Sequence, residues 1–489
     1  MSLVGSSARG GGVGKGLRRL VACSGAVLLA ACANQSAPPT TPPPTTQPSR
    51  EAFVDTLEER TFRFFWDTAN PANGLVPDRW PDPPFSSVAA VGFGLGAYPV
   101  GVERGYVTRD EARARTLATL RFLWNAPQGP GATGVAGYRG FYYHFLDMNT
   151  GLRFKTVELS TIDTALLMAG VLTVQEYFDQ DQPQEREIRS LADSLYRRVD
   201  WAWMQDPSGL VSMGWNPENG RLTSAYEGYD EAMILYLLAL GSPTHPVEAT
   251  AWPAFTSTYP WKEFYGQTHV NFAPLFGHQY SQIWVDFRGI QDAFMRGKGI
   301  DYFENSRRAT LAQQSYAADN PGGWVGYGAN VWGLTASDGP VGATLVVDGR
   351  SRTFHTYWAR GADATAIRDD GTIAPTAAGG SVAFAPDIAL EALQTMRRSY
   401  GDNLFGQYGF YDAFNPTLRG NEQVSAGHIV PGVGWFDDQY LGIDQGPIVL
   451  MLENYRSGLI WDLLRTNPYI VRGLCRAGFT GGWIEGRCG

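Results

Sequence analysis

The chain has 489 residues, of which 44% are hydrophobic and 13% aromatic, so it is long enough to bury a large core. Its formal net charge is -9 and no stripe of clustered Lys and Arg occurs, which argues against a nucleic-acid partner. The 15 Trp and 23 Tyr are typical of core filling, and flat rings of this kind also suit stacking on sugars.

The N-terminus has the features of a targeting segment. Residues 1–31 form a predicted signal peptide, because a basic stretch without acids precedes the apolar run "LVACSGAVLLAAC", which is too short to span a membrane. The residues "LAAC" (29–32) resemble a lipoprotein cleavage site, so we expect Cys32 to be lipidated; an ordinary small-residue cleavage site is the alternative. Residues 32–50 are Pro/Thr-rich and predict an extended tether. The protein is therefore expected to be exported and lipid-anchored, at the periplasmic face of the outer membrane or at the cell surface.

Apolar periodicity predicts one mostly helical domain over residues 51–489. Long loops rich in Gly, Trp, Asn and Pro connect the helices, and strand-like runs such as "TLVVDG" (344–349) predict only minor hairpins. Many helices around one core, with elaborate loops at one end, favour an all-α toroid of helix pairs with a central cleft. The predicted helices are 51–67, 108–124, 160–178, 184–204, 229–240, 301–318, 386–399 and 443–458, with weaker runs at 86–98 and 279–293.

The segment "TVELSTIDTALLMAG" (156–170) places an acid at the start of an apolar helix. Ser160 or Thr161 can cap the helix, and Asp163 lies among apolar residues. A buried Asp needs a partner or a chemical role, so Asp163 is either a hydrogen-bonding residue of the core or part of a site. Glu158, just before the helix, is expected at the rim of the cleft.

The stretch "YDEAMILYLLAL" (229–240) repeats this arrangement. Asp230 and Glu231 are predicted in the first turn of a helix, where acids also simply stabilise the helix. The next turn is wholly apolar, so the side chain of Glu231 is expected on the buried face, where desolvation raises a carboxyl pKa. Such a group suits the proton donor that glycosidic bond hydrolysis requires beside a second carboxylate.

A third acidic group precedes an apolar helix in "WFDDQYLGIDQGPIVLMLENY" (435–455), with Asp437, Asp438 and Asp444. Three helices led by acids predict one converging site.

Other chemistries find little support in the sequence. The stretches "GGGVGKG" (10–16) and "GFGLG" (92–96) lack the context of a phosphate loop, and the six His residues show no metal-ligand spacing. We therefore expect no cofactor and no metal. Near the C-terminus, Cys475 and Cys488 are expected to form a disulfide in an oxidising compartment, with two free thiols as the alternative.

Several long runs resemble one known family. They include "GFYYHFLDMNTGLRFKTVELSTIDTALLMAG", "YDEAMILYLLALGSPTHP", "FGHQYSQIWVDFRGIQDAFM", "YGFYDAFNPT" and "YLGIDQGPIVLMLENYRSGLIWDLLRTNPYI". These runs are similar to the bacterial glucoamylase-like domain of the endo-β-1,2-glucanases of glycoside hydrolase family 144 and, more distantly, of cyclic β-1,2-glucan synthases. The resemblance covers nearly all of residues 51–480.

The resemblance implies an (α/α)6 toroid that hydrolyses β-1,2-glucan with inversion and without a cofactor. It implies that Glu231 is the proton donor, which agrees with the expectation from burial. For the second carboxylate we rank Asp163 and Asp444 ahead of Glu158 and Asp412. Inversion needs room for water, so we expect about 6.5–9.5 Å or more between donor and base, whereas about 5 Å would indicate retention.

Substrate contacts are expected from the loops, where flat rings and bidentate donors accompany acceptors. For each of these residues, packing or loop bracing is an equally good interpretation. Residues 341–369 and 419–434 match the family less clearly, which leaves the substrate and the cleavage mode open. The candidates are Asp412, His278, Asp286, Arg288, Trp332 and Trp215.

The leading hypothesis is therefore an endo-acting β-1,2-glucan hydrolase, expected to be monomeric and to touch a membrane only through its lipid. An exo-acting enzyme that releases sophorose, or a β-1,2-glucan transglycosylase, would share the same motifs. A polysaccharide lyase is disfavoured by the acidic composition and the lack of a basic groove, and a non-catalytic glucan-binding lipoprotein is a further alternative.

Overall fold

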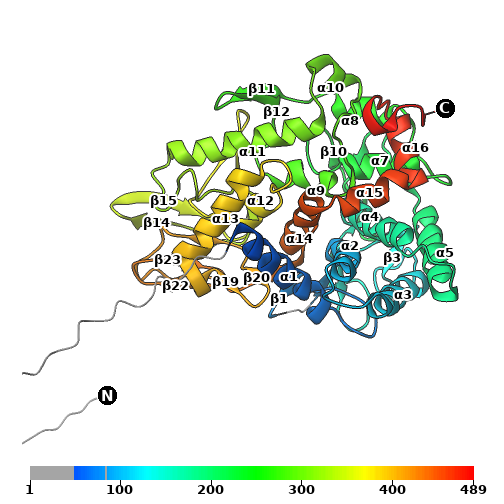
Figure 1. The fold of residues 1–489 in the computed structure, drawn as a ribbon, viewed down its shortest axis with the longest axis horizontal. Helices are drawn as coiled ribbons and strands as arrows, with labels where there is room; N and C mark the ends of the chain where they lie inside the picture. Colours follow the sequence, from blue (N-terminus) through cyan, green and yellow to red (C-terminus); the bar gives the residue numbers. More distant parts are fainter. Residues whose placement is uncertain (1–48, 83–84, 489) are drawn as a thin grey trace, which may run out of the picture. The chain divides into compact units, whose positions relative to one another are not determined.

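Helices form most of the regular secondary structure (Figure 1). The computed structural model describes residues 49–82 and 85–488. The predicted signal peptide, Cys32 and nearly all of the predicted tether lie outside the described residues. The helices are α1 (Arg50–Thr68), α2 (Val88–Glu103), α3 (Arg109–Asn125), α4 (Thr161–Tyr177), α5 (Pro183–Arg198), α6 (Trp201–Met204), α7 (Met233–Gly241), α8 (Ala251–Thr256), α9 (Phe276–Trp284), α10 (Ala293–Lys298), α11 (Tyr302–Asp319), α12 (Pro375–Gly379), α13 (Pro386–Tyr400), α14 (Gly442–Arg456), α15 (Leu459–Thr466) and α16 (Pro468–Arg476), with 3-10 turns at Gly401–Asn403 and Gly482–Ile484.

Six helices, α2, α4, α7, α9, α12 and α14, form an inner ring. Nearly all of their residues are buried, because each is covered on every side by neighbouring helices. Around the ring, α2 contacts α4, α4 contacts α7, and α7 contacts α9. On the other side, α12 contacts α14, and α14 contacts α2. The Gln279 side chain of α9 closes the remaining gap by donating to the Ala377 carbonyl of α12 (2.8 Å).

The outer helices α1, α3, α5, α11, α13 and α16 bury only one face, and α15 packs against α4, α9 and α14. In α5 the buried residues include Ile188, Ala192, Leu195 and Tyr196, which recur at the spacing of an amphipathic helix. Six inner and six outer helices, in partly alternating chain order, confirm the predicted all-α (α/α)6 toroid. No described helix combines the length and the apolar character needed to cross a bilayer.

Glycine lets two inner helices touch. A Cβ atom at Gly92 in α2 would lie 2.4 Å from the Leu166 carbonyl oxygen of α4, and one at Gly170 would lie 2.1 Å from the Gly92 oxygen. The stretch "GFGLG" therefore serves helix packing within α2, which explains why it lacks the surroundings of a phosphate loop.

The strands are short and lie in the connections, as predicted. The hairpin of β14 and β15 covers the run at 344–349, and the longest strands have five residues. The strands are β1 (Arg79–Trp80), β2 (Phe85–Ser87), β3 (Gly137–Tyr138), β4 (Phe141–Tyr142), β5 (Phe145–Asp147), β6 (Leu159–Ser160), β7 (Val211–Ser212), β8 (Gly214–Asn216), β9 (Gly220–Arg221), β10 (Ala225–Tyr226), β11 (Trp261–Phe264), β12 (Gln267–Val270), β13 (Ala336–Ser337), β14 (Ala343–Val347), β15 (Arg350–Phe354), β16 (Trp358–Ala359), β17 (Gly361–Ala362), β18 (Ile367–Arg368), β19 (Phe405–Gly406), β20 (Gly409–Phe410), β21 (Phe414–Asn415), β22 (His428–Val430), β23 (Gly434–Phe436) and β24 (Tyr440–Leu441).

Some helix boundaries differ from the predictions. The helix predicted at 229–240 begins only at Met233, and the one predicted at 184–204 is split into α5 and α6. The weak run at 279–293 corresponds to α9 and the start of α10. The short helices α8, α12, α15 and α16 were not predicted, because pieces of five to nine residues are too short to show a clear period.

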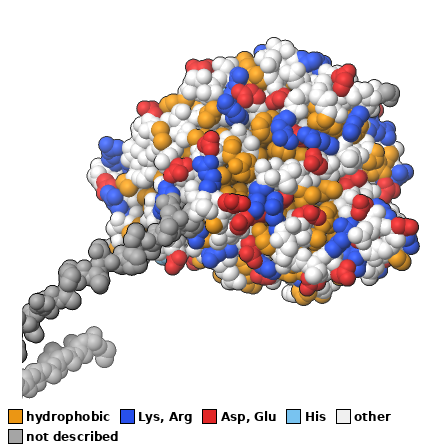
Figure 2. Space-filling model, in the orientation of Figure 1, with side chains coloured by type: hydrophobic (Ala, Val, Ile, Leu, Met, Phe, Trp, Pro, Cys, Tyr) orange, Lys and Arg blue, Asp and Glu red, His pale blue; other side chains and the backbone are white. Residues whose placement is uncertain are grey.

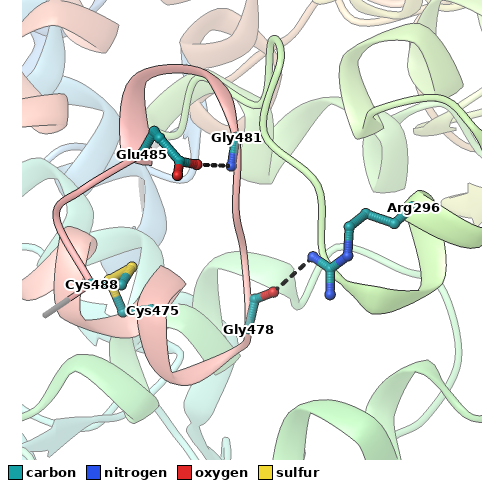
Figure 3. The surroundings of a disulfide bond; sticks show 6 residues. All are labelled: Arg296, Cys475, Gly478, Gly481, Glu485 and Cys488. Atoms are coloured by element: carbon teal, nitrogen blue, oxygen red, sulfur yellow. Dashed lines mark hydrogen bonds between the residues drawn. A yellow bond between two sulfur atoms is a disulfide. The ribbon is translucent and has the colours of Figure 1, made fainter.

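The C-terminal tail is fixed to the domain. Cys475 and Cys488 form a disulfide with Cα atoms 5.2 Å apart (Figure 3). Beside it, the Arg296 guanidinium donates to the Gly478 carbonyl (3.1 Å) and the Gly481 amide donates to Glu485 (3.1 Å).

Candidate active site

A cavity of about 560 Å³ lies where the inner helices begin. Strand β2 leads into α2, Ser160 and Asp163 mark the start of α4, Glu231 precedes α7, and Phe276 and Ile443 start α9 and α14. Helix N-termini carry free N–H groups and favour negative charge, which suits a site built from acids. The remaining lining residues include Asp78, Arg79, Phe85, His144, Phe145, Glu158, Ile162, Met213, Leu222, Tyr226, Tyr280, Tyr357 and Ala359.

Glu231 lines this cavity from a turn, not from a helix. The first-turn position predicted for Asp230 and Glu231 is wrong, because Ala232 caps α7 and the Asp230 carboxylate accepts from the Ala232 amide (2.8 Å). The Ser281 hydroxyl donates to the Glu231 carbonyl (2.8 Å) and accepts from the Ile234 amide (2.9 Å), so α9 fixes the turn.

The Glu231 carboxyl is suited to donate a proton. Burial, reinforced by Asp230 and Asp163, raises the pKa of Glu231 to about 8, although His144 and Tyr226 act in the opposite direction. Burial also raises the pKa of Asp230 to about 8. A carboxyl with a pKa near 8 stays protonated at neutral pH, which is the state that a general acid needs.

His144 joins two of the other acids. Its Nδ1 lies 2.8 Å from Glu158 Oε1 and its Nε2 lies 3.5 Å from Asp163 Oδ1. Burial alone would lower the pKa of His144, but Asp163, Glu158 and Asp78 raise it to about 9, so the ring is a cation at neutral pH. The cation in turn lowers the pKa of Glu158 through their hydrogen bond.

Asp163 combines helix capping with a place in the cavity. Its amide donates to the Ser160 hydroxyl (3.2 Å), and that hydroxyl donates to Asp163 Oδ2 (2.5 Å). The side chain is almost buried, and both of its oxygens already have neighbours, Ser160 and His144.

A second acidic group, Asp338, Asp412, Asp437 and Asp444, borders the cavity behind Arg79. All four side chains are buried. The Asp338 amide donates to Asp412 Oδ2 (2.6 Å), and Arg79 donates to Asp338 (3.0 Å). None of the four acids lines the cavity itself, but Arg79, which binds Asp338, does so, and Asp444 follows the lining residue Ile443 in the sequence.

This acidic group holds more negative charge than its one arginine can balance. Burial and the neighbouring acids raise the pKa of Asp412 to about 6, that of Asp437 to about 9, and that of Asp444 well above its ordinary value. One carboxyl oxygen on each of these three has no hydrogen-bond partner among the described residues. Because Asp412 and Asp444 act directly on each other, one proton held between them would give both unpartnered oxygens a bond.

The same acids are also the group that could hold a metal ion. Carboxylate oxygens of Asp338, Asp412 and Asp437 lie within 4.8 Å of one another. A cation there would require deprotonated carboxyls, whereas burial favours protonation of Asp437 and Asp412. The expectation of no metal stays a prediction.

None of the six predicted substrate contacts lines the cavity, and four of them have structural contacts elsewhere. His278 is buried against Tyr229, with Nε2 3.1 Å from the Phe272 carbonyl, and burial lowers its pKa to about 3. Trp332 is fully buried in a hydrophobic cluster. Asp286 pairs with Arg288 (2.8 Å) and with Arg465 near the C-terminal tail.

The remaining two predicted contacts lie closer to the site. Trp215 lies on β8 and packs against Tyr138 and Trp203. Strand β8 pairs with β6, which directly follows Glu158. Asp412 belongs to the second acidic group. His144, Arg79, Asp338 and Tyr357 were not predicted, because isolated residues in separate loops carry no motif.

Comparisons with known proteins agree with this architecture. A family model described as "Putative glucoamylase" matches residues 223–468. An exo β-1,2-glucooligosaccharide sophorohydrolase (non-reducing end) from Parabacteroides distasonis is 30% identical over 479 residues, which cover 90% of this chain. The chain spans only 60% of that relative's length.

Two crystal structures match over almost their whole length. An endo-β-1,2-glucanase from Chitinophaga pinensis, solved with sophorotriose and glucose, is 30% identical with a TM-score of 0.75, over 89% of this chain and 100% of that one. A protein from Bacteroides uniformis that carries the same description as the family model is 33% identical with a TM-score of 0.75, over 89% of this chain and 99% of that one. The family model and these similarities show that the chain belongs to the glucoamylase-like family.

Proposed function

We propose that the protein is a glycoside hydrolase that cleaves β-1,2-glucan with inversion of the anomeric centre. One observation carries the proposal: Glu231, whose pKa is raised to about 8, lines the same cavity as Arg79, which binds the second acidic group through Asp338. Hydrolysis of a glycosidic bond needs this pairing of one protonated and one ionised carboxyl. The named activities of the similar glucanases support the choice of linkage.

In the proposed reaction, Glu231 transfers its proton to the glycosidic oxygen as the bond from that oxygen to the anomeric carbon breaks. A water molecule forms the new bond to this carbon from the opposite face, and its proton passes to the second carboxylate. We assign that role to the pair of Asp412 and Asp444, which share a side-chain hydrogen bond. With one proton held between them the pair keeps one negative charge that can accept the proton from water, whereas both oxygens of Asp163 already have neighbours. Solvent then returns a proton to Glu231 and removes one from the pair.

His144 and Arg79 balance the negative charge around the substrate. His144 lies 2.8 Å from Glu158 and 3.5 Å from Asp163, and Arg79 lies 3.0 Å from Asp338 and 3.3 Å from Asp78. Glu231, whose pKa is raised to about 8, supplies the proton. We place Glu158 and Asp163 in substrate binding and charge balance.

We further propose that cleavage is endo-acting. The structure matched over its whole length is an endo-glucanase, whereas the exo-acting relative is matched over 60% of its length. A sophorose-releasing exo mode is the second candidate, since that relative shares 30% identity.

Product analysis tests these proposals. The protein is incubated with linear β-1,2-glucan, α-1,4-glucan and β-1,3-glucan, and the size and anomeric form of the products are followed from the first minutes. A mixture of short β-1,2-oligomers that appear first as α-anomers is expected. Early release of a single disaccharide would indicate the exo mode. Products that appear first as β-anomers would contradict inversion. Oligosaccharides longer than the starting glucan would indicate transglycosylation.

We also propose that the protein is exported and anchored by a lipid on Cys32, on the basis of its N-terminal sequence. Metabolic labelling with a radioactive fatty acid in a bacterial host should label the wild type. The Cys32→Ser variant should stay unlabelled and leave the membrane fraction. Labelling that survives this substitution would refute the anchor.

A further inference from the structure

One aromatic side chain in the cavity is about half exposed. Tyr357 is 49% exposed and lines the cavity beside Ala359 and Tyr280. Other exposed large hydrophobic residues among the described ones, such as Val346, Ile367 and Tyr455, do not line it. A large apolar ring left open in a concave site indicates a ligand contact, since burial would otherwise be favourable.

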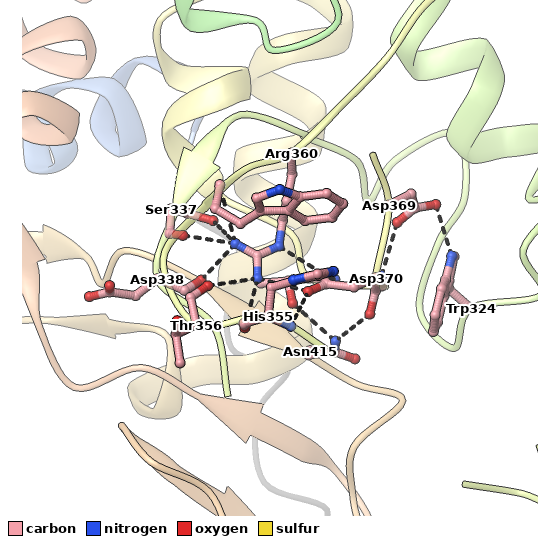
Figure 4. Close-up of polar contacts among 12 residues, drawn as sticks. Trp324, Ser337, Asp338, His355, Thr356, Arg360, Asp369, Asp370 and Asn415 are labelled. Atoms are coloured by element: carbon pink, nitrogen blue, oxygen red, sulfur yellow. Dashed lines mark hydrogen bonds and ion pairs between the residues drawn. The ribbon is translucent and has the colours of Figure 1, made fainter. Parts of the chain in front are cut away.

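The backbone around Tyr357 is fixed on both sides. Arg360 is fully buried and donates to the carbonyls of His355 (3.1 Å), Thr356 (3.2 Å) and Trp358 (3.4 Å) (Figure 4). Its guanidinium also binds Asp370 through two bonds of 2.7 and 2.8 Å. Both neighbours of Tyr357 are thus held by one side chain, which limits the freedom of the exposed ring.

The same anchor connects Tyr357 to the acids. Arg360 donates to the carbonyls of Ser337 (2.8 Å) and Asp338 (3.2 Å), and β16, which follows Tyr357, pairs with β13. Burial raises the pKa of the Tyr357 hydroxyl, and the negative charges of Asp444 and Asp412 raise it further. The ring therefore stands next to the carboxyls to which the proposed function assigns water activation.

We propose that Tyr357 is a platform on which one glucosyl unit of the glucan stacks, next to the bond that is cleaved. This inference rests on the proposed function for the identity of the sugar. The C–H face of a pyranose ring is apolar while its edge carries hydroxyls, so it matches a tyrosine that offers an open ring and a polar tip. Because the backbone on both sides of the ring is held before binding, the loop loses little conformational freedom when the sugar stacks.

The position of Tyr357 makes it a determinant of specificity. It lies in residues 341–369, the part of the chain that resembles the family less clearly, so the platform can differ between relatives that share the acids. Stacking contributes to binding in the ground state and to the transition state alike, so its loss raises KM and leaves kcat nearly unchanged.

Two substitutions separate the ring from its hydroxyl. Tyr357→Ala is expected to raise KM for β-1,2-glucooligosaccharides about ten-fold or more, while Tyr357→Phe keeps KM within about three-fold of the wild type. Tyr455→Ala, which removes an equally exposed tyrosine (42%) outside the cavity, is the matched control and should change neither constant. An unchanged KM in Tyr357→Ala, or an equal loss in both Tyr357 variants, would overturn the proposal.

Binding measurements keep this inference apart from the proposed function. In the Glu231→Gln background, which is expected to bind without turnover, affinity for β-1,2-, β-1,3- and α-1,4-glucans is measured by calorimetry with and without Tyr357→Ala. If the wild type does not hydrolyse β-1,2-glucan, the proposed function fails. The platform is still supported if at least one of the three glucans binds and Tyr357→Ala lowers the affinity for it about ten-fold. The platform is refuted if no glucan binds, or if Tyr357→Ala lowers the affinity for none of them.

Discussion

Asp370 and Asp437 are both fully buried, yet their surroundings have opposite effects. Asp370 receives two bonds from the buried Arg360, which lower its pKa against the effect of burial. Asp437 lies beside Asp412 and Asp338, and burial with these neighbours raises its pKa to about 9. One carboxylate is neutralised by a cation, and the other is placed among like charges.

This contrast distinguishes a carboxylate with a structural role from one at a functional site. The Arg360–Asp370 pair is satisfied on nearly every polar atom and ties two loops together, which is the arrangement of a structural ion pair. The second acidic group leaves carboxyl oxygens without partners and keeps protons at neutral pH, a condition that a fold tolerates mainly at functional sites. On the face shown in Figure 2, by comparison, acidic and basic side chains are interspersed.

The largest expected effect on activity comes from Glu231→Gln. Removal of the proton donor should lower kcat by about 10²–10⁴-fold, because the leaving oxygen then departs without a proton. Circular dichroism and the melting temperature should stay close to the wild type. Glu227→Gln, four residues earlier and exposed, is the control; a Glu231→Gln enzyme with more than about a tenth of the wild-type kcat would contradict the assignment.

The pH profile should reflect the same carboxyl. A general acid works in its protonated form, so kcat/KM should fall as pH rises through about 8, the value to which burial raises the pKa of Glu231. Asp230 titrates in the same range and lies next to it, so the falling limb belongs to the pair. Activity that is still rising at pH 9 would contradict this.

The largest effect on stability is expected at the structural pair. Arg360→Gln leaves Asp370 buried without its cation and should lower the free energy of unfolding by about 3–5 kcal/mol. Urea denaturation at pH 7 measures the loss. Arg419→Gln, which removes an exposed pair with Asp348, should change stability by less than about 1 kcal/mol.

Two neutral isosteres should shift stability in opposite directions. The folded-state pKa of Asp437 is raised, so its ionisation destabilises the fold increasingly as pH rises from about 4 towards 9, and Asp437→Asn should stabilise the protein by about 1–3 kcal/mol at pH 8 and much less at pH 4. Asp370→Asn should instead destabilise at neutral pH, and its deficit should shrink as pH falls below about 4, because the pKa of Asp370 is lowered. Melting curves at both pH values decide; the same sign for both variants would contradict the comparison.

The smallest expected effect concerns His144. Its pKa is raised to about 9, so the stability from its ionic contacts is fully present below pH 6.5 and is lost as pH rises through 9. His144→Gln should cost about 1 kcal/mol at pH 6 and nearly nothing at pH 10. The exposed His428→Gln is the matched control and should show no such pH dependence.

The sequence predicted the ring of helices and most of the acids near the site, including Asp412, Asp437 and Asp444, but for a physical reason it did not predict Asp338 and Arg79, which surround them. The fully apolar helices after Asp163 and Glu231 reveal buried inner helices directly, because no other position tolerates them. Asp338, Asp412 and Arg79 come from short strands and turns far apart in the chain, and only the tertiary fold brings them together. The polar turn before α7 was predicted as helix because acids are common in first turns.

The last helix of the chain has a consequence for biosynthesis. α16 lies directly on α7: a Cβ atom at Gly473 would be 2.1 Å from the Leu237 carbonyl oxygen, and Arg476 donates to the Leu240 carbonyl (3.1 Å). The helix that follows Glu231 therefore lacks its outer cover until residues 468–476 have been translated, so we expect a nascent chain that has not yet folded this helix to be inert towards glucan. The test compares two ribosome-bound chains: one arrested before Pro468, and one that includes Gly489 and a long linker. Activity in the second chain only would show that turnover requires α16.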